Sequence, residues 1–170
     1  MSRRKTLRAE RARRATAHHE AGHAVMAWAL GLTVQSVSIK PRRSSHGQVM
    51  IDVPRWVSRG DPKNPVVRLW AEANIMSQMS GFVAERRYRG RANHVGAFAD
   101  YANTYETASV LTFSRKERDL FLDWLFVRAC SLMRRLSAQR AVNTVARVLL
   151  EKERISGRTV ARIANRAWQA

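Results

Sequence analysis

The sequence predicts a mainly α-helical domain with a small β-hairpin or sheet. Its 170 residues are enough for one buried core and too few for two ordinary domains. Apolar and polar residues alternate between residues 34 and 53, as in strands, whereas from residue 66 onward apolar residues recur three and four positions apart, as in helices. Because 45% of the residues are hydrophobic, disorder over the whole chain is excluded.

Residues 1–14 form a basic arm ahead of a domain predicted to span residues 15–170. The arm has seven Arg or Lys residues and one acid, Glu10, so seven minus one leaves a net charge of +6. Such a segment either contacts polyanions weakly or is a solvated tail. No apolar periodicity precedes Ala12. We therefore expect residues 1–10 to be mobile and the first helix to run from Ala12 to Leu30, ending at Gly31.

Two strands and a loop are predicted after the first helix. In residues 34–40, Val37 and Ile39 alternate with serines, and Pro41 ends the segment. Residues 47–53 alternate in the same way, which predicts a hairpin or two neighbouring strands. Residues 54–65 contain the turn-forming run Arg59-Gly60-Asp61-Pro62 and are predicted to be a loop.

The remainder of the chain is predicted to be helical. One helix ends by Gly90 and carries a stripe of apolar and small residues: Val66, Leu69, Ala73, Met76, Ser80 and Val83. Further helices are expected at residues 98–113, 118–136, 138–152 and 159–168. The segment 118–136 is strongly apolar, and these side chains are expected in the core of a helical bundle: Leu120, Phe121, Trp124, Leu125, Val127, Leu132 and Leu136.

The charge, the N-terminal residues and the cysteine content indicate the cellular compartment. The net charge is +18, and the longest stretch without a formal charge, residues 21–39, contains several polar side chains, so no transmembrane helix is expected. The basic N-terminus is not followed by the apolar segment of a secretory signal. Cys130 is the one cysteine, cannot form an internal disulfide and is expected in the core. We expect a cytoplasmic protein.

The first helix contains His19-Glu20-Ala21-Gly22-His23, which has the His-Glu-x-x-His pattern of zinc proteases. Residues i and i+4 share one face of a helix, so both imidazoles can reach one Zn²⁺ while Glu20 projects beside the open coordination position. A carboxylate there can take a proton from water and pass it to a leaving amine. The alternative is a surface helix with two histidines and an ion-paired Glu20.

The residues alone leave the third metal ligand open. The metzincin extension is excluded, because the Gly and His that it requires after His23 are absent. Four candidates lie on later elements: Glu85, His46, His94 and Asp100. Asp100 also has a second interpretation, as an acid that stabilises the N-terminus of a helix.

Four separated segments together resemble the peptidase domain of FtsH-type ATP-dependent zinc proteases. They follow the family's order and cover most of residues 16–165. They are His19-Glu20-Ala21-Gly22-His23-Ala24 with the two strands after it, Met79-Ser80-Gly81-Phe82-Val83-Ala84-Glu85, Gly96-Ala97-Phe98-Ala99-Asp100, and Leu149-Leu150-Glu151-Lys152-Glu153 with Ile155-Ser156-Gly157.

The resemblance implies a zincin-like metallopeptidase of mostly helical fold. It implies that His19, His23 and Asp100 hold Zn²⁺ and that Glu20 is the general base toward a metal-activated water. Glu85 is then either a partner for the second N–H of a ligand histidine or an exposed charge at a helix end.

In the family, the strand nearest the site binds extended substrate through its main chain. This strand maps to residues 47–52, and the expected substrate contacts are Gly47, Gln48, Val49 and Met50.

The sequence also departs from the family. It shows neither the family's membrane anchor nor the Gly-x-x-x-x-Gly-Lys-[Ser/Thr] loop of its ATPase domain. His18 and the pair His94-Val95 replace residues usual in the family, and His18 is interpreted as flanking the site.

We expect a zinc metalloendopeptidase that cleaves flexible or unfolded polypeptides. A separate ATPase or unfoldase and a second copy of the chain are candidate partners. The alternative is a non-enzymatic binding module of the same fold, whose basic surface binds nucleic acid or an acidic protein.

Overall fold

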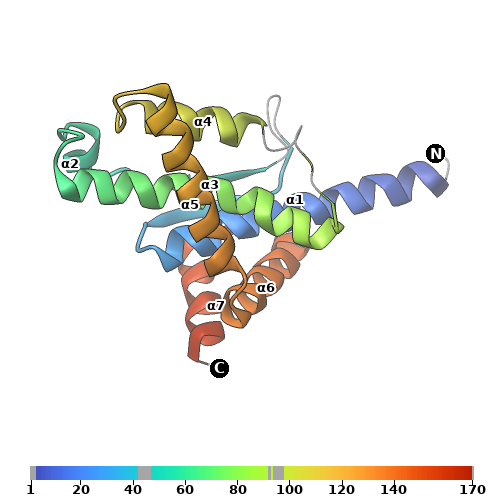
Figure 1. Ribbon diagram of the computed structural model, residues 1–170. Helices are drawn as coiled ribbons and strands as arrows, with labels where there is room; N and C mark the ends of the chain where they lie inside the picture. Colours follow the sequence, from blue (N-terminus) through green and yellow to red (C-terminus); the bar gives the residue numbers. More distant parts are fainter. Residues whose placement is uncertain (1–2, 42–46, 92, 94–97, 170) are drawn as a thin grey trace.

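The structure is a computed structural model and describes residues 3–41, 47–91, 93 and 98–169. Helix α1 is central: it packs against α3, α6 and α7 and contacts a three-stranded antiparallel sheet (Figure 1). The elements in chain order are α1 (Arg3–Ala29), β1 (Val34–Ser38), β2 (Gln48–Ile51), α2 (Arg55–Ser58), α3 (Pro65–Arg89), α4 (Phe98–Ser109), α5 (Arg115–Met133), α6 (Leu136–Lys152), β3 (Arg154–Ser156) and α7 (Gly157–Gln169).

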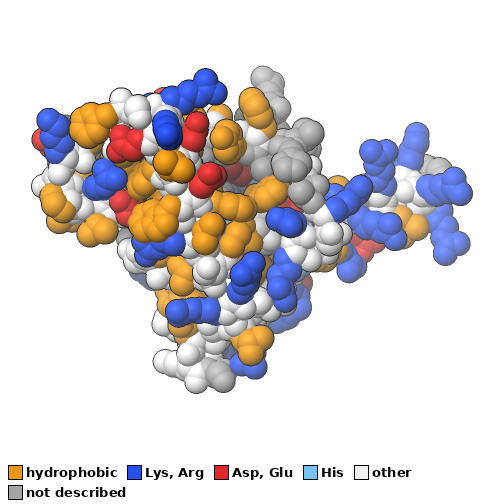
Figure 2. All heavy atoms as spheres, in the orientation of Figure 1, with side chains coloured by type: hydrophobic (Ala, Val, Ile, Leu, Met, Phe, Trp, Pro, Cys, Tyr) orange, Lys and Arg blue, Asp and Glu red, His pale blue; other side chains and the backbone are white. Residues whose placement is uncertain are grey.

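Helix α1 is longer than predicted. It begins at Arg3, so the predicted start at Ala12 is wrong, and residues 3–10 form helix rather than an irregular tail. Residues 3–14 are all exposed, and the first turns of this segment project from the body with Lys and Arg side chains around them (Figures 1 and 2). This segment is rich in Arg, Ala, Glu and Leu, which favour helix even without an apolar face. Because the packed half of α1 already forms the first helical turns, the helix only has to be extended into this segment.

The second half of α1 is buried. Small residues, Ala15, Ala17, Ala21, Ala24 and Ala27, are fully buried, and they allow neighbouring elements to approach closely on several sides. The helix then ends as predicted, because Gly31 adopts a φ of +80° that favours glycine.

The contact between α1 and α3 depends on Gly22. A Cβ atom at this position would overlap the backbone oxygen of Ser80 and lie 2.6 Å from the Cβ of Ala84. The two helices therefore touch backbone to backbone here, which holds the His-Glu-x-x-His turn of α1 directly against α3.

The predicted hairpin is confirmed, and a third strand joins it. Strand β1 lies between β2 and β3 and is antiparallel to both, with Val37 opposite Val49 on one side and Ile155 on the other. Strand β3 has three residues, too few for a recognisable alternation in the sequence. Gly157 follows it directly, where a Cβ atom would overlap the carbonyl group of Val34.

Helix α3 has the predicted ends but a different buried side. Asn64 caps it by accepting a hydrogen bond from the backbone N–H of Val66 at 2.9 Å, and Gly90 ends it with a φ of +71°. The side chains of Val66 and Leu69 are 57% and 65% exposed, and Val67 is buried instead. The prediction was wrong because neighbouring apolar residues fit the helical period in two registers.

The expected core of the segment 118–136 is also partly wrong. The buried face of α5 consists of Leu122, Leu125, Ala129 and Met133. In contrast, these expected core residues are exposed: Leu120, Trp124, Val127 and Leu136. The segment is apolar around its whole circumference, so its composition does not show which side is buried. The predicted loop at residues 54–65 contains the short helix α2.

The other helices, α4, α6 and α7, lie where the sequence predicts them, apart from a few residues at their ends. Cys130 is half-buried and lies outside the core cluster, so its expected place in the core is wrong. None of the helices that the structure describes combines the length and the apolar character needed to cross a membrane.

We expect the substitution Gly22→Ala to lower the free energy of unfolding by about 1–3 kcal/mol, because the new methyl group overlaps α3. In an unobstructed helix the same change stabilises by about 0.5–1 kcal/mol. Urea denaturation followed by circular dichroism measures the difference. Gly90→Ala is the control: its Cβ atom meets nothing within 4 Å, so any loss of stability in this variant comes from the left-handed backbone and not from overlap with a neighbour. A Gly22→Ala protein as stable as the original chain would contradict the close contact.

Candidate metal centre

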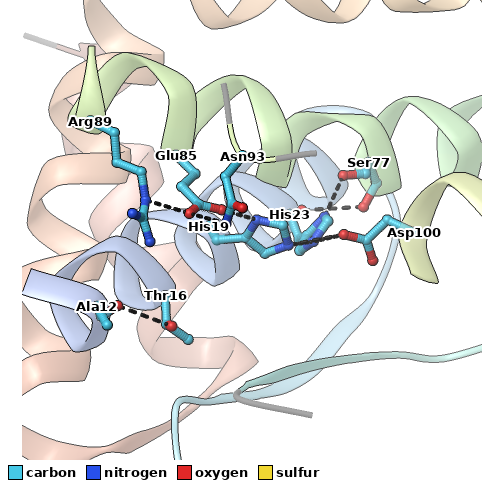
Figure 3. Close-up of polar contacts among 9 residues, drawn as sticks. All are labelled: Ala12, Thr16, His19, His23, Ser77, Glu85, Arg89, Asn93 and Asp100. Atoms are coloured by element: carbon cyan, nitrogen blue, oxygen red, sulfur yellow. Dashed lines mark hydrogen bonds and ion pairs between the residues drawn. The ribbon is translucent and has the colours of Figure 1, made fainter. Parts of the chain in front are cut away.

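Two histidines of α1 and one aspartate of α4 converge on a single point (Figure 3). His19 Nε2 lies 2.9 Å from His23 Nε2 and 2.9 Å from Asp100 Oδ2, and His23 Nε2 lies 3.3 Å from the same carboxylate oxygen. Both histidines are buried, and the side chain of Asp100 is 25% exposed. The histidines meet because they are one helical turn apart, whereas Asp100 is brought in from the first turn of α4.

The Nδ1 nitrogen of each histidine is hydrogen-bonded to an acceptor on α3. His23 Nδ1–H donates to the backbone oxygen of Ser77 at 2.8 Å, and the hydroxyl of Ser77 donates back to the backbone oxygen of His23 at 3.2 Å. His19 Nδ1–H donates to Glu85 at 3.1 Å. These bonds fix both tautomers and leave both Nε2 lone pairs directed at the common point.

Glu85 is in turn held by two donors. The Nδ2 group of Asn93 donates to it at 2.8 Å and the Nε group of Arg89 at 2.6 Å. The side chain of Glu85 is only 5% exposed, so its alternative interpretation as an exposed helix-end charge is wrong. Its contact with His19 agrees with the predicted role as partner of a ligand histidine.

Sequence reasoning missed Ser77 and Gly81, which share one face of α3 with Glu85 at intervals of four. A Cβ atom at Gly81 would overlap the imidazole ring of His23, so this glycine makes the space in which the ring lies. The pattern small, small, acid at four-residue spacing is the signal that could have indicated the face of α3 turned toward the site.

The three converging atoms fit a cation. Two imidazole lone pairs and a carboxylate oxygen are all acceptors, so they repel one another unless a positive charge lies between them. A tetrahedral Zn²⁺ with bonds of about 2.0–2.1 Å separates its ligand atoms by about 3.3 Å. The observed separations of 2.9–3.3 Å need only small outward shifts to match.

The pKa shifts show the same demand for positive charge. Burial by itself lowers the pKa of His19, but the carboxylates of Asp100 and Glu85 outweigh it and raise the pKa to about 10. Burial favours the neutral form of Asp100, yet its bonds to His19 and His23 hold its pKa well below the usual range. The centre of the cluster therefore stabilises a cation, whether a proton or a metal ion.

Glu20 lies between this cluster and strand β2. It is 6% exposed, and burial raises its pKa, although the two histidines act in the opposite direction. A Cβ atom at Gly47, just before β2, would overlap the carboxylate of Glu20. The acid of the motif is thus enclosed by α1 on one side and by the entry to the edge strand on the other.

Comparison with known protein families matches residues 6–112 with the model of Peptidase family M41. These residues make up more than half of the chain and include the cluster together with Glu20 and Glu85. The chain belongs to peptidase family M41. Membership implies a metallopeptidase and confirms the FtsH-type peptidase domain that the motifs predict. No curated protein matches this M41 chain.

The other predicted residues fall into two groups. His18 lies off the cluster and stacks on Tyr88, with ring centroids 4.2 Å apart, which agrees with its interpretation as a flanking residue. Gln48, Val49 and Met50 form most of β2. The second group lies outside the described residues. It comprises the candidate third ligands His46 and His94, and also Val95, Gly96 and Ala97.

We expect the M41 chain to bind one Zn²⁺ and the variants His23→Ala and Asp100→Ala to lose it on dialysis, since each removes a converging ligand atom. Glu85→Gln should bind the metal about 10- to 100-fold more weakly, because His19 loses a charged partner. Elemental analysis and competition with a chromogenic chelator measure both effects, with Asp61→Ala in an exposed loop as control. Loss of metal from Glu85→Ala together with full retention by Asp100→Ala would instead make Glu85 the third ligand.

Proposed function

We propose that this M41 chain is a zinc endopeptidase that hydrolyses peptide bonds in flexible or unfolded polypeptides. One observation carries the proposal: two imidazole nitrogens and a carboxylate oxygen converge within 3.3 Å beside a buried glutamate. Two nitrogens and one oxygen form a ligand set that suits Zn²⁺ and leaves a coordination position for water or substrate.

The residues of the chain have separate roles in this proposal. A bound Zn²⁺ would supply Lewis acidity toward the scissile carbonyl and would lower the pKa of water. Glu20 takes the proton of the attacking water and delivers it to the nitrogen of the leaving amine. Ser77 and Glu85 hold the two imidazoles in the orientation that leaves Nε2 free.

Substrate would bind along strand β2. In the part of the chain that the structure describes, β2 pairs only with β1 and forms one edge of the sheet. The backbone N–H of Asp52 bonds to Thr33 on the β1 side. Since successive residues alternate, Val49 directs its N–H and C=O toward the open edge, where an extended peptide can pair with it. Gly47 and Glu20 lie at the start of this edge.

The binding-module alternative is not favoured. A binding module requires no general base, yet Glu20 is enclosed at the centre of the motif. The three residues proposed as ligands, His19, His23 and Asp100, also lie together. The basic helical extension of α1, residues 3–14, supports only an accessory role in weak contact with polyanions.

We expect Glu20→Gln to retain the fold and bound zinc but to cleave casein at least about 100-fold more slowly, because an amide cannot accept the proton. Release of soluble peptides is the measurement, and Glu151→Gln on the surface of α6 is the matched control. Equal rates for the Glu20→Gln and original chains would remove Glu20 from the mechanism. Inactivity of the zinc-loaded original chain would favour the binding module.

Val49→Pro should raise KM for an extended peptide about 2- to 10-fold, because it removes one outward-facing N–H and the hydrogen bond formed by it. Val49→Ala is the control: it loses the same packing but keeps the N–H. Steady-state kinetics with a quenched fluorescent peptide distinguish the two variants. If both variants raise KM equally, main-chain pairing at Val49 does not hold substrate.

Deletion of residues 1–10 should leave zinc content and casein cleavage nearly unchanged, because residues 3–10 are exposed and lie outside the core. The deletion should elute from heparin at a lower salt concentration, since several positive charges are removed. Loss of peptide cleavage at full zinc occupancy would show that the extension belongs to the active assembly.

A further inference from the structure

A groove of about 270 Å³ lies between α6 and α7, and none of the converging metal-site residues lines it. Half-buried Val148 and Ile163 are its apolar residues. Thr144 and Thr159 also line it, but their hydroxyl groups already form hydrogen bonds to residues three or four positions earlier in the chain. The groups left to bind a ligand are therefore the charged ones.

Positive charge comes from both walls of the groove. Arg147 and Lys152 line it from α6, whereas Arg162 and Arg166 lie four residues apart on α7. Glu151 is the one acid of the lining, so four minus one leaves a net charge of +3. All five residues are exposed. The fold thus holds like charges opposite each other, which is unfavourable unless an anion lies between them.

Most of this positive charge has no counter-charge in the protein. Arg147 Nη1 lies 3.4 Å from Glu151 Oε1, so one cation of the groove is paired. In the part of the chain that the structure describes, no carboxylate lies within 4.0 Å of a charged nitrogen of Lys152, Arg162 or Arg166. Three cations of the groove are therefore available to an anion from outside.

The surroundings of the groove are also basic. Residues 136–169 contain seven Arg or Lys residues and two acids, so seven minus two leaves a net charge of +5. The second acid, Glu153, is already contacted by Arg13 at 3.3 Å and by Lys40 at 3.9 Å. Arg158 is exposed one turn before the arginines of the groove, about 6 Å along α7, and extends their row.

We propose that the groove between α6 and α7 binds a chain of phosphate groups, as in inorganic polyphosphate or the triphosphate of a nucleotide. Guanidinium groups bind phosphate through two parallel N–H donors, and an ammonium group adds a point charge. A phosphate chain carries oxygens on all its sides, so cations on both walls can contact it at once. The inference does not depend on the proposed peptidase function.

Two features of the lining favour a phosphate chain over a nucleic acid strand. Among the described residues of the lining there is no aromatic side chain, so bases would have no ring to stack on. The volume of about 270 Å³ is also small. Since one water molecule takes about 30 Å³ of the liquid, the groove holds roughly nine waters, which is enough for a few phosphate groups.

Isothermal titration calorimetry of the zinc-loaded chain with sodium tripolyphosphate, in about 0.15 M NaCl to screen long-range attraction, tests the site. The double variant Arg162→Gln/Arg166→Gln should bind at least about 10-fold more weakly, because two charge-assisted contacts are lost. Arg115→Gln/Lys116→Gln is the matched control: it removes the same charge from the exposed start of α5 and should keep the original affinity. Any binding of zinc by the phosphate is common to both variants. An equal loss in both would mean that net charge alone attracts the anion, and the proposal would be wrong.

Nuclear magnetic resonance locates the ligand on the original chain without any substitution. The side-chain Nε–Hε resonances of Arg162 and Arg166 should shift on addition of tripolyphosphate, whereas that of Arg115 should not. Unshifted resonances of both groove arginines at saturating tripolyphosphate would overturn the site. Because these resonances are read from the folded chain, the result is independent of peptidase activity.

Competition distinguishes the sources of the phosphate chain. Long-chain inorganic polyphosphate, adenosine triphosphate and a single-stranded oligonucleotide are each added to the tripolyphosphate complex, at equal concentrations of phosphate groups. Strongest displacement by polyphosphate supports an inorganic ligand, and strongest displacement by adenosine triphosphate supports a nucleotide. Strongest displacement by the oligonucleotide would make nucleic acid the ligand and overturn the proposal.

Discussion

The site depends on the close approach of α1 and α3. Gly22 lets the two backbones touch, and Gly81 leaves space for the ring of His23. At this separation His23 reaches the carbonyl of Ser77 and His19 reaches Glu85, so both rings are oriented by the same helix that packs against them. A wider gap between the helices would release both imidazoles. Their orientation is therefore a property of backbone packing as much as of the ligand residues.

Much of the fold follows from local sequence signals. Gly31 and Gly90 end helices where the sequence predicts, and the alternation around Val37 correctly indicates the hairpin. Predictions failed where one sequence fits two arrangements. Either Val66 or Val67 could lie on the buried face of α3, so the sequence did not decide between two helical registers. The start of α1 was missed because its polar residues form helix without an apolar face.

The candidate site was predictable to a different degree. His19 and His23 share a helix, so their spacing alone places them together, and Glu20 follows from the same motif. Asp100 is distant in sequence, and only resemblance to a family singled it out. Ser77 orients His23 through its backbone oxygen, which any residue could supply, so the spacing of small residues on α3 indicates the face turned toward the site but not this hydrogen bond. Such contacts are visible only when the tertiary structure is known.

Helix α1, which carries two of the candidate ligands, is also the central helix of the core. Its two histidines are flanked by fully buried residues such as Ala21 and Val25, and Asp100 joins them only when α4 packs beside the site, so the complete cluster forms only in the folded chain. An ion that binds the folded chain and not the unfolded one stabilises the fold by mass action, by about 2.7 kcal/mol at a free concentration one hundred times Kd. A metal ion held at the candidate centre would thus stabilise the fold as well as serve the proposed chemistry.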